Sequence, residues 1–352
     1  MPRTVFLHGR PSHPFHQALA RSLGADFLVK DFLLRWHDHD APRLRRYLSW
    51  LLCSFCFPQR EAYDLILTEG PQFVPLLMRR LGLLRPHQRT AAIIAGETPY
   101  FLKANRYPPA SAAALRAALA SYDLLVCVGA MHAELVREVL GERTPPLLTI
   151  SSGLSPSRRQ ALSTVEPDPG SRLALHIGNM IAPWRAFYKG LDLAVASVAR
   201  ARRWVPGLHL EIVGTLSAEV IQQAQPAGVA ASSWLSFVGP VADLRPSLRR
   251  AGLYIHLGRG EAGPMTVLEA MSAGVPALVS EWTGLREAVA AVDPHLVVPL
   301  DEDMAAERIA WFMALSPTQR QELSRRSRQV AARYTEERAV SSFRDGLAGF
   351  MG

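Results

Sequence analysis

Several common features are missing from this chain, and each absence narrows the class of protein. No apolar run reaches the roughly 18–20 residues that a membrane-spanning helix needs. Only three of the 352 residues are cysteines, which gives no disulfide framework and fits a reducing cytosol. No short-period repeat or low-complexity tail is present. Together these absences favour an ordinary globular, cytoplasmic protein, and we expect it there.

Two short segments partly match known motifs, a signal peptide and a CxxC metal or redox motif, but neither match is complete. The N-terminal stretch Met1–Gly9 is too short for a signal peptide and is expected to form a first strand. Cys53 and Cys56 form a CxxC pair, but no second Cys or His pair follows at ligand spacing. We therefore expect neither a zinc site nor redox chemistry there.

The positive charge of the chain is unevenly placed. The net charge is +8, and residues 1–165 hold 20 Lys and Arg against 12 Asp and Glu, whereas residues 166–352 hold 19 of each. Such one-sided charge points to an anionic partner, which could be a lipid surface, a phosphorylated acceptor or nucleic acid. The basic residues adjoin aliphatic runs and no nucleic-acid module is visible, so we expect no nucleic acid partner.

Apolar strands alternate with helical stretches along both halves of the chain. This alternation predicts an α/β fold with parallel sheets covered by helices on both faces. A linker rich in turn formers, Thr164–Ser171, divides the chain into domains 1–165 and 166–334, and Thr335 can cap a last helix over 335–352. The strands expected in the first half are Thr4–His8, Asp26–Val29, Asp64–Thr68, Thr90–Ala95, Leu124–Val128 and Leu147–Ile150.

The most informative stretch is a strand, a glycine-containing loop and a helix. Leu253–Leu257 predicts a buried strand, and Pro264 suits the first position of a helix over Met265–Ala273. Gly274 suits the end of that helix. A helix that starts at the carboxyl end of a strand offers free N–H groups to a phosphate, and ligands of open α/β sheets bind at this end.

Two acids, Glu261 and Glu269, flank the start of this helix. Glu269 falls opposite the apolar helix face, so a solvated surface acid is the plain alternative for it. An acid cannot itself hold a phosphate, so a ligand role for either one means binding hydroxyls of a sugar or ribose.

The pattern Glu261-x7-Glu269, continued by Ala-Met-Ser-Ala-Gly-Val-Pro, resembles the donor-site signature of retaining glycosyltransferases of family 4, glycosyl transferases group 1. Tyr188-Lys189-Gly190, after a strand that ends at Gly178, resembles the Lys-Gly phosphate element of the same family. The resemblance covers about residues 170 to 345 and is weak over residues 1–165.

This resemblance implies the GT-B fold: two Rossmann-like parallel-sheet domains facing a central cleft, with a C-terminal helix crossing back to the N-terminal domain. It implies a retaining, metal-independent hexosyltransferase that uses a UDP- or GDP-linked sugar as co-substrate and needs no other cofactor. The acceptor would be a hydroxyl, lipid-linked ones included, in glycolipid, polysaccharide or other glycoconjugate synthesis.

The resemblance also assigns roles to residues. Lys189 would neutralise the diphosphate, Glu261 would hold sugar hydroxyls and Glu269 the ribose. The family usually has Arg where this chain has Asn179, and Arg185 could supply that charge from a longer loop. The implied donor-binding residues are Gly178, Asn179, Gly214, Val238, Gly239, Gly263, Met265, Thr266, Val267 and Glu269.

The departure at Asn179 leaves an alternative open. Ser151–Leu154 also looks like a degenerate form of the family's interdomain element. A GT-B-like chain retained as a non-catalytic binding subunit would account for both departures.

Candidates for the acceptor side follow strands of the first half. They are Gly9, Arg10, Glu97 and His132, and an ordinary structural role is the alternative for each. Asp38-His-Asp40 has the form of a DxD metal motif, but it precedes Pro42 and a helix, so helix capping explains it and no metal is expected.

Two segments combine basic residues with apolar runs. Pro42–Phe57 leads from Arg43, Arg45 and Arg46 into an aromatic-rich stretch, as interfacial membrane helices do. Leu76–Arg85 is a second such segment. Peripheral attachment to an anionic membrane surface is the interpretation we favour, and a core helix with one charged end is the alternative.

Overall fold

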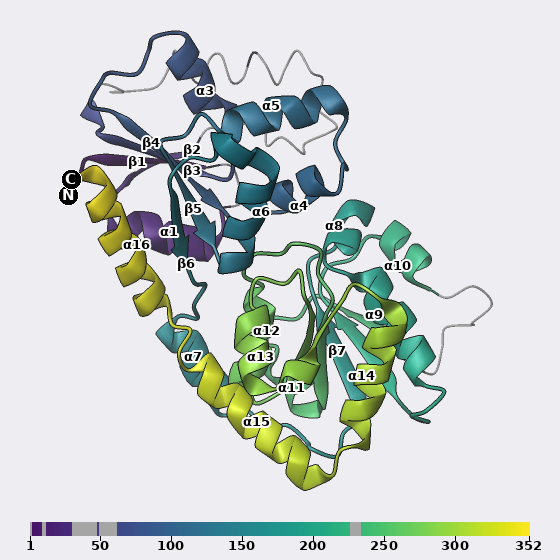
Figure 1. The fold of residues 1–352 in the computed structure, drawn as a ribbon. Helices are drawn as coiled ribbons and strands as arrows, with labels where there is room; N and C mark the ends of the chain where they lie inside the picture. Colours follow the sequence, from purple (N-terminus) through teal and green to yellow (C-terminus); the bar gives the residue numbers. More distant parts are fainter. Residues whose placement is uncertain (1, 9–11, 30–47, 49–61, 226–233) are drawn as a thin grey trace. The chain divides into compact units, whose positions relative to one another are not determined.

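The computed structural model describes residues 2–8, 12–29, 48, 62–225 and 234–352 (Figure 1). Gly9, Arg10, the Asp38–Asp40 motif, the CxxC pair and all of Pro42–Phe57 except Leu48 lie outside the described residues. The chain divides into two compact units. The first combines Met1–Ser152 with Glu336–Gly352, and the second is Gly153–Thr335.

The first unit is built on a six-stranded parallel sheet in the order β2-β1-β3-β4-β5-β6. Its inner strands are apolar and almost wholly buried, as expected for a parallel sheet covered on both faces. The strands are β1 (Thr4–His8), β2 (Asp26–Val29), β3 (Leu65–Glu69), β4 (Arg89–Ile94), β5 (Leu124–Val128) and β6 (Leu147–Ile150).

The last helix of the chain, α16 (Glu336–Met351), belongs to the first unit, where it packs on α1 and β6 (Figure 1). Phe343 and Leu347 are its fully buried anchors, and a Cβ at Gly346 would lie 2.3 Å from a methyl carbon of Leu148. The expected return of the C-terminal helix to the first unit is therefore confirmed. The other helices of this unit are α1 (Pro14–Ser22), α3 (Phe73–Arg80), α4 (Thr98–Lys103), α5 (Pro109–Leu119) and α6 (Ala130–Leu140).

The second unit also has six parallel strands, in the order β12-β11-β10-β7-β8-β9. The strands are β7 (Leu173–Ile177), β8 (His209–Val213), β9 (Leu235–Gly239), β10 (Leu253–His256), β11 (Ala277–Ser280) and β12 (Val297–Val298). The helices are α7 (Pro156–Ser163), α8 (Pro183–Tyr188), α9 (Leu191–Ala201), α10 (Ala218–Ala224), α11 (Arg245–Arg250), α12 (Met265–Ser272), α13 (Arg286–Val292), α14 (Glu302–Ala314) and α15 (Pro317–Ala331).

The strand order of the second unit reverses between β7 and β10. The chain builds β8 and β9 outward from β7, and then returns to place β10 on the other side of β7. Helices leave neighbouring strands in opposite directions at such a reversal, and the carboxyl ends there form the usual ligand crevice of an open α/β sheet. The topology therefore predicts a ligand site formed by the residues that follow β7 and β10.

The boundary between the units differs from the one expected after residue 165. It falls at Ser152–Gly153, because α7 packs against α12 and its Leu162 is fully buried in the second core. The charge is consequently shared more evenly than the sequence halves suggested. The first unit holds 20 basic and 15 acidic side chains, and the second holds 19 and 16.

The first half of Leu76–Arg85, one of the two segments considered for membrane contact, lies in α3. Val74 and Met78 of this helix are fully buried, and Leu76 and Leu77 pack against the core. Arg79, at its end, pairs with Asp123 at 2.8 Å. The core-helix alternative therefore describes α3. Within the described ranges every helix is too short or too polar to cross a bilayer.

Candidate functional site

The loop after α8 brings Lys189 to the end of β7. Gly190 has a φ of +71°, and a Cβ there would lie 1.9 Å from the backbone oxygen of Leu257, so only glycine allows this approach. A Cβ at Gly178 would lie 2.9 Å from Cδ of Lys189. The two glycines therefore let the lysine side chain lie directly over the end of the strand.

Lys189 meets Glu261, which follows β10. Its Nζ donates to Glu261 Oε1 at 2.6 Å, and the two side chains are only 12% and 16% exposed. Nε2 of the fully buried His256 lies 2.9 Å from Oε2 of the same carboxylate. Burial alone would raise the pKa of Glu261, but Lys189 and His256 outweigh it and hold the pKa well below its usual range. The carboxylate is therefore ionised at neutral pH.

Two buried imidazoles lie beneath this pair. The rings of His176, on β7, and His256, on β10, are nearly parallel with centroids 6.0 Å apart. Nδ1 of His176 donates to the backbone oxygen of Ile255 at 2.9 Å. Burial, with His256 nearby, lowers the pKa of His176 from 6.5 to about 3. The ring is therefore neutral, and it carries its proton on Nδ1.

Helix α12 begins beside this pair with uncapped N–H groups. Pro264 occupies the N-cap position in an extended conformation and gives no side-chain cap, and the first turn has no acid. The expectation that Pro264 is the first helical residue is therefore wrong by one position. The hydroxyl of Thr266 is already bonded to Tyr254 at 2.7 Å, so the backbone near Met265 and Thr266 is what this helix end offers a ligand.

Gly274 ends α12 as expected. Its φ is +82°, and a Cβ there would lie 2.6 Å from Nε of Arg328. Arg328, on α15, donates to the backbone oxygens of Ser272 and Val165. An arginine that the sequence analysis did not single out therefore fastens the end of this helix.

Glu269 is not a solvated acid. Its side chain is only 14% exposed, and Oε1 accepts from Nε of Arg158 at 2.6 Å. Burial raises the pKa of Glu269, although the hydrogen bond from Arg158 opposes this. Arg158 was missed because it lies in α7, 111 positions earlier, in a segment assigned to the first domain.

Arg185 lies next to Asn179. Its Nε donates to the backbone oxygen of Asn179 at 3.2 Å, and its guanidinium lies 5.4 Å from the ring of Trp184. The longer loop therefore places the Arg185 side chain against the backbone of Asn179, just after β7. Whether it meets a phosphate there stays a prediction.

The other predicted donor-site residues lie around the same sheet edge. A Cβ at Gly214, after β8, would lie 1.9 Å from the backbone oxygen of Gly178, so the two loops touch. Val238 and Gly239 end the edge strand β9, where Val238 is 45% exposed. Gly263 directly precedes the N-cap of α12, and Val267 is fully buried in its first turn.

The acceptor-side candidates that can be described lie in the first unit. Glu97 is the N-cap residue of α4, after β4, and is buried. His132 is fully buried in α6. At the end of β3, Glu69 accepts from the backbone N–H of His13 and from Nδ1 of His16, both at 2.8 Å. A ligand role for any of these stays a prediction.

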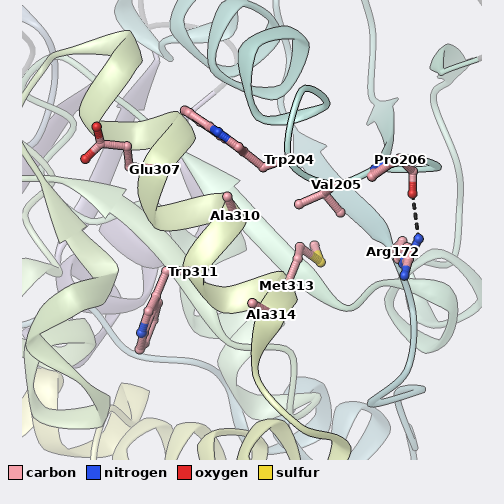
Figure 2. Close-up of a pocket in the computed structure, with 9 residues that line it drawn as sticks. All are labelled: Arg172, Trp204, Val205, Pro206, Glu307, Ala310, Trp311, Met313 and Ala314. Atoms are coloured by element: carbon pink, nitrogen blue, oxygen red, sulfur yellow. Dashed lines mark hydrogen bonds between the residues drawn. The ribbon is translucent and has the colours of Figure 1, made fainter.

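A pocket of about 550 Å³ lies at the opposite end of the second sheet (Figure 2). Arg172, just before β7, donates to the backbone oxygen of Pro206, just before β8, at 2.6 Å. Trp204 and residues of α14 complete the lining. Because it faces the amino ends of the strands, this pocket is separate from the Lys189–Glu261 site.

The polar groups of the site suit phosphates and hydroxyls. The ammonium of Lys189, the guanidinium of Arg185 and the uncapped N-terminus of α12 are complementary to anionic oxygens. The carboxylates of Glu261 and Glu269 are complementary to hydroxyl groups. Among the described residues, no group of three or more His, Cys, Asp or Glu side chains is placed to hold a metal ion.

Comparison with known proteins agrees with this geometry. Residues 171–314 match the model of the family Glycosyl transferases group 1. The chain is 30% identical to glycogen synthase of Mycobacterium tuberculosis over 173 residues, which are 48% of this chain and 40% of that protein. It therefore spans less than half the length of this curated relative.

Solved structures match over the whole chain. Sucrose-phosphate synthase from Thermosynechococcus elongatus has a TM-score of 0.72 at 15% identity, covering 99% of this chain and 100% of that one. The HepE protein of Anabaena, in complex with UDP and glucose, has a TM-score of 0.65 at 14% identity, with 99% of both chains covered. The GT-B fold is thus confirmed, and so is the resemblance to glycosyl transferases group 1.

The buried His176 predicts a pH dependence of stability. Because the folded protein holds this ring neutral, the unfolded chain binds more protons between pH 6.5 and about 3, and stability falls as the pH falls through that range. Between pH 7 and pH 5 we expect His176 to contribute a loss of about 2 kcal/mol. Urea denaturation should therefore show that the free energy of unfolding of His176→Leu falls less between pH 7 and pH 5 than that of wild type.

The matched control is His87→Leu, which removes an exposed imidazole. It should retain the wild-type dependence. An equal slope in His176→Leu and wild type would contradict the assignment.

Proposed function

We propose that this chain is a retaining glycosyltransferase that moves a sugar from a nucleotide-diphosphate sugar to an acceptor hydroxyl. The observation that carries the proposal is the largely buried Lys189–Glu261 pair beside the uncapped N-terminus of α12, at the strand-order reversal of the second sheet. The match of residues 171–314 to Glycosyl transferases group 1 supports it.

The diphosphate would lie between Lys189 and the start of α12. Lys189, joined by Arg185, would neutralise the charge that develops on the leaving group. The backbone N–H groups of Met265 and Thr266 would add donors, whereas that of Val267 already donates to the backbone oxygen of Pro264 at 3.0 Å. Because these groups supply the positive potential, we propose a reaction that does not depend on a metal ion.

The sugar and the nucleoside would be held by hydroxyl contacts. Glu261, kept ionised by Lys189, would accept from sugar hydroxyls, and Glu269 from the ribose. Backbone at Val238 and Gly239 would meet the base. The UDP and glucose bound by HepE support a UDP-linked hexose, with a GDP-linked donor as the alternative.

No nucleophile is assigned in this mechanism. The acceptor hydroxyl would attack on the face from which the diphosphate leaves, and the leaving phosphate would receive its proton. Retention of configuration then follows without a covalent intermediate. The first unit would supply acceptor contacts through Gly9, Arg10 and Glu97, whereas the fully buried His132 would act only through its neighbours.

The acceptor we propose is a lipid-linked or polymeric glycoconjugate, with the chain attached peripherally to the cytoplasmic face of a membrane. The sequence of Pro42–Phe57 supports this, because three arginines precede an aromatic-rich apolar stretch. The excess of 20 basic over 15 acidic side chains in the first unit adds a weaker general attraction to anionic lipid.

Replacing Lys189 tests the catalytic proposal. Lys189→Ala should lower donor turnover by a factor of about 10² to 10³, because a charge on the leaving group loses its principal partner. The measurement is release of UDP or GDP from a panel of sugar nucleotides. Lys103→Ala, which removes another ion-paired lysine in the first unit, is the control and should retain activity.

Near-normal turnover by a folded Lys189→Ala would refute the phosphate role. A wild-type chain that binds nucleotide without turning over any sugar nucleotide would instead favour a non-catalytic GT-B-like binding subunit.

Replacing Glu269 tests the ribose contact. Glu269→Gln should raise the dissociation constant of free UDP or GDP about tenfold or more, since hydrogen bonds to a charged acceptor contribute about 1.5–3 kcal/mol. Isothermal calorimetry gives the value directly. Glu302→Gln, which alters the pair between Arg200 of α9 and Glu302 of α14, should leave the dissociation constant unchanged. An unchanged value for Glu269→Gln would remove Glu269 from the ribose site.

Flotation with liposomes tests membrane attachment. We expect the wild-type chain to float with vesicles that contain anionic lipid and to remain behind with purely zwitterionic ones, because arginines are drawn to the negative surface. Replacing Arg43, Arg45 and Arg46 together with serine should abolish the shift. The absence of any lipid-dependent shift in wild type would contradict the proposal.

A further inference from the structure

Arg259 lies two positions before Glu261, yet its charge faces away from the site. The side chain is buried, and its two Nη atoms donate to the two carboxylate oxygens of Asp192, each at 2.7 Å. Nη1 also donates to the backbone oxygen of Phe187, and the guanidinium carbon lies 3.9 Å from the centroid of the Phe187 ring. This arginine therefore joins the β10–α12 loop to the turn between α8 and α9.

The same two segments are joined by their backbones. The N–H of Arg259 donates to the backbone oxygen of Tyr188 at 2.7 Å, and the Tyr188 hydroxyl donates to that of Gly260 at 3.2 Å. Gly190 touches Leu257, as described above. Residues 187–192 and residues 257–261 are thus held to each other through several contacts.

Each of these segments carries one member of the ion pair. Lys189 lies in the first, and Glu261 in the second. The proposed donor presents its diphosphate to one of them and its sugar to the other, so the spacing between the segments determines whether both groups are held at once. Misplacement by about 1 Å can cost a factor of about 10² in rate.

The guanidinium is well suited to fix this spacing. Its planar fork matches the carboxylate of Asp192 with two hydrogen bonds while its face covers an aromatic ring, and a lysine ammonium does neither in that geometry. Its charge is balanced by Asp192, which lies in the first turn of α9, where the helix dipole also favours an acid. It is therefore not the cation that would meet the diphosphate.

We propose that Arg259 is a positioning residue that sets the separation of Lys189 and Glu261, and that Asp192 and Phe187 hold it in place. This inference rests on the proposed function, since it assigns the two segments to the two halves of one donor. It predicts that loss of the Arg259 fork damages transfer far more than nucleotide binding.

The test compares Arg259→Lys, Arg259→Met and Asp192→Asn with wild type. Calorimetry measures the dissociation constants of UDP and GDP, which lack the sugar, and product release measures hydrolysis of UDP-glucose and GDP-mannose. Arg250→Lys is the matched control, because Arg250 also pairs with a carboxylate, that of Glu211 at 2.8 Å, at the amino end of the same sheet. Thermal melting confirms that each variant is folded.

We expect the Arg259 variants to bind the nucleoside diphosphate within threefold of wild type and to hydrolyse the sugar nucleotide at least tenfold more slowly. The double variant Arg259→Lys, Asp192→Asn should hydrolyse the sugar nucleotide no more slowly than the slower of the two single variants, because both substitutions break the same Arg259–Asp192 contact. In the Arg259 variants, amide hydrogen exchange should become faster in peptides 187–192 and 257–261 together. In Arg250→Lys it should be unchanged in both peptides.

Hydrolysis within threefold of wild type, or binding and hydrolysis falling in equal proportion, would overturn the positioning role. If the wild-type chain neither binds these nucleotides nor hydrolyses these sugar nucleotides, the proposed function fails. Hydrogen exchange then decides on its own, and unchanged exchange in the two segments of Arg259→Lys would overturn the coupling between them.

Discussion

The ion pair between Lys189 and Glu261 is the interaction on which the candidate site depends. A carboxylate this buried would be costly without a partner, and a lone buried ammonium would be too. Each therefore stabilises the charged state of the other at the carboxyl end of the sheet. A bound diphosphate and sugar would have to compete with, or share, these contacts between Lys189 and Glu261.

Close backbone approach makes that pair possible. Gly190 lies against Leu257 and Gly214 against Gly178, so three loops from different strands converge without intervening side chains. Two arginines then fasten the surrounding segments: Arg259 joins the β10–α12 loop to Asp192 of α9, and Arg328 holds the end of α12. Both arginines are thus bonded to the protein itself, Arg259 to the carboxylate of Asp192 and Arg328 to the backbone oxygens of Ser272 and Val165.

Much of this arrangement could be predicted from the sequence, for identifiable reasons. The strands were predicted closely because the apolar runs of parallel sheets are continuous, and Gly274 and the break before α16 followed from local rules of helix ends. The pairing of Arg158 with Glu269 could not be predicted, because no periodic pattern joins positions so far apart. Arg259 was missed for a related reason, since a basic residue in a loop gives no sign of whether it faces a ligand or another carboxylate.

The return of α16 to the first unit has a consequence for how the chain folds as it is made. The first sheet is complete by Ile150, but Phe343 and Leu347, which cover it, are synthesised only after the whole second unit. At about 5–20 residues per second, an emerging chain would leave that apolar surface uncovered for roughly 10 to 40 s. The nascent first unit therefore passes through an interval in which its exposed apolar surface invites binding by a chaperone, and α16 closes that interval.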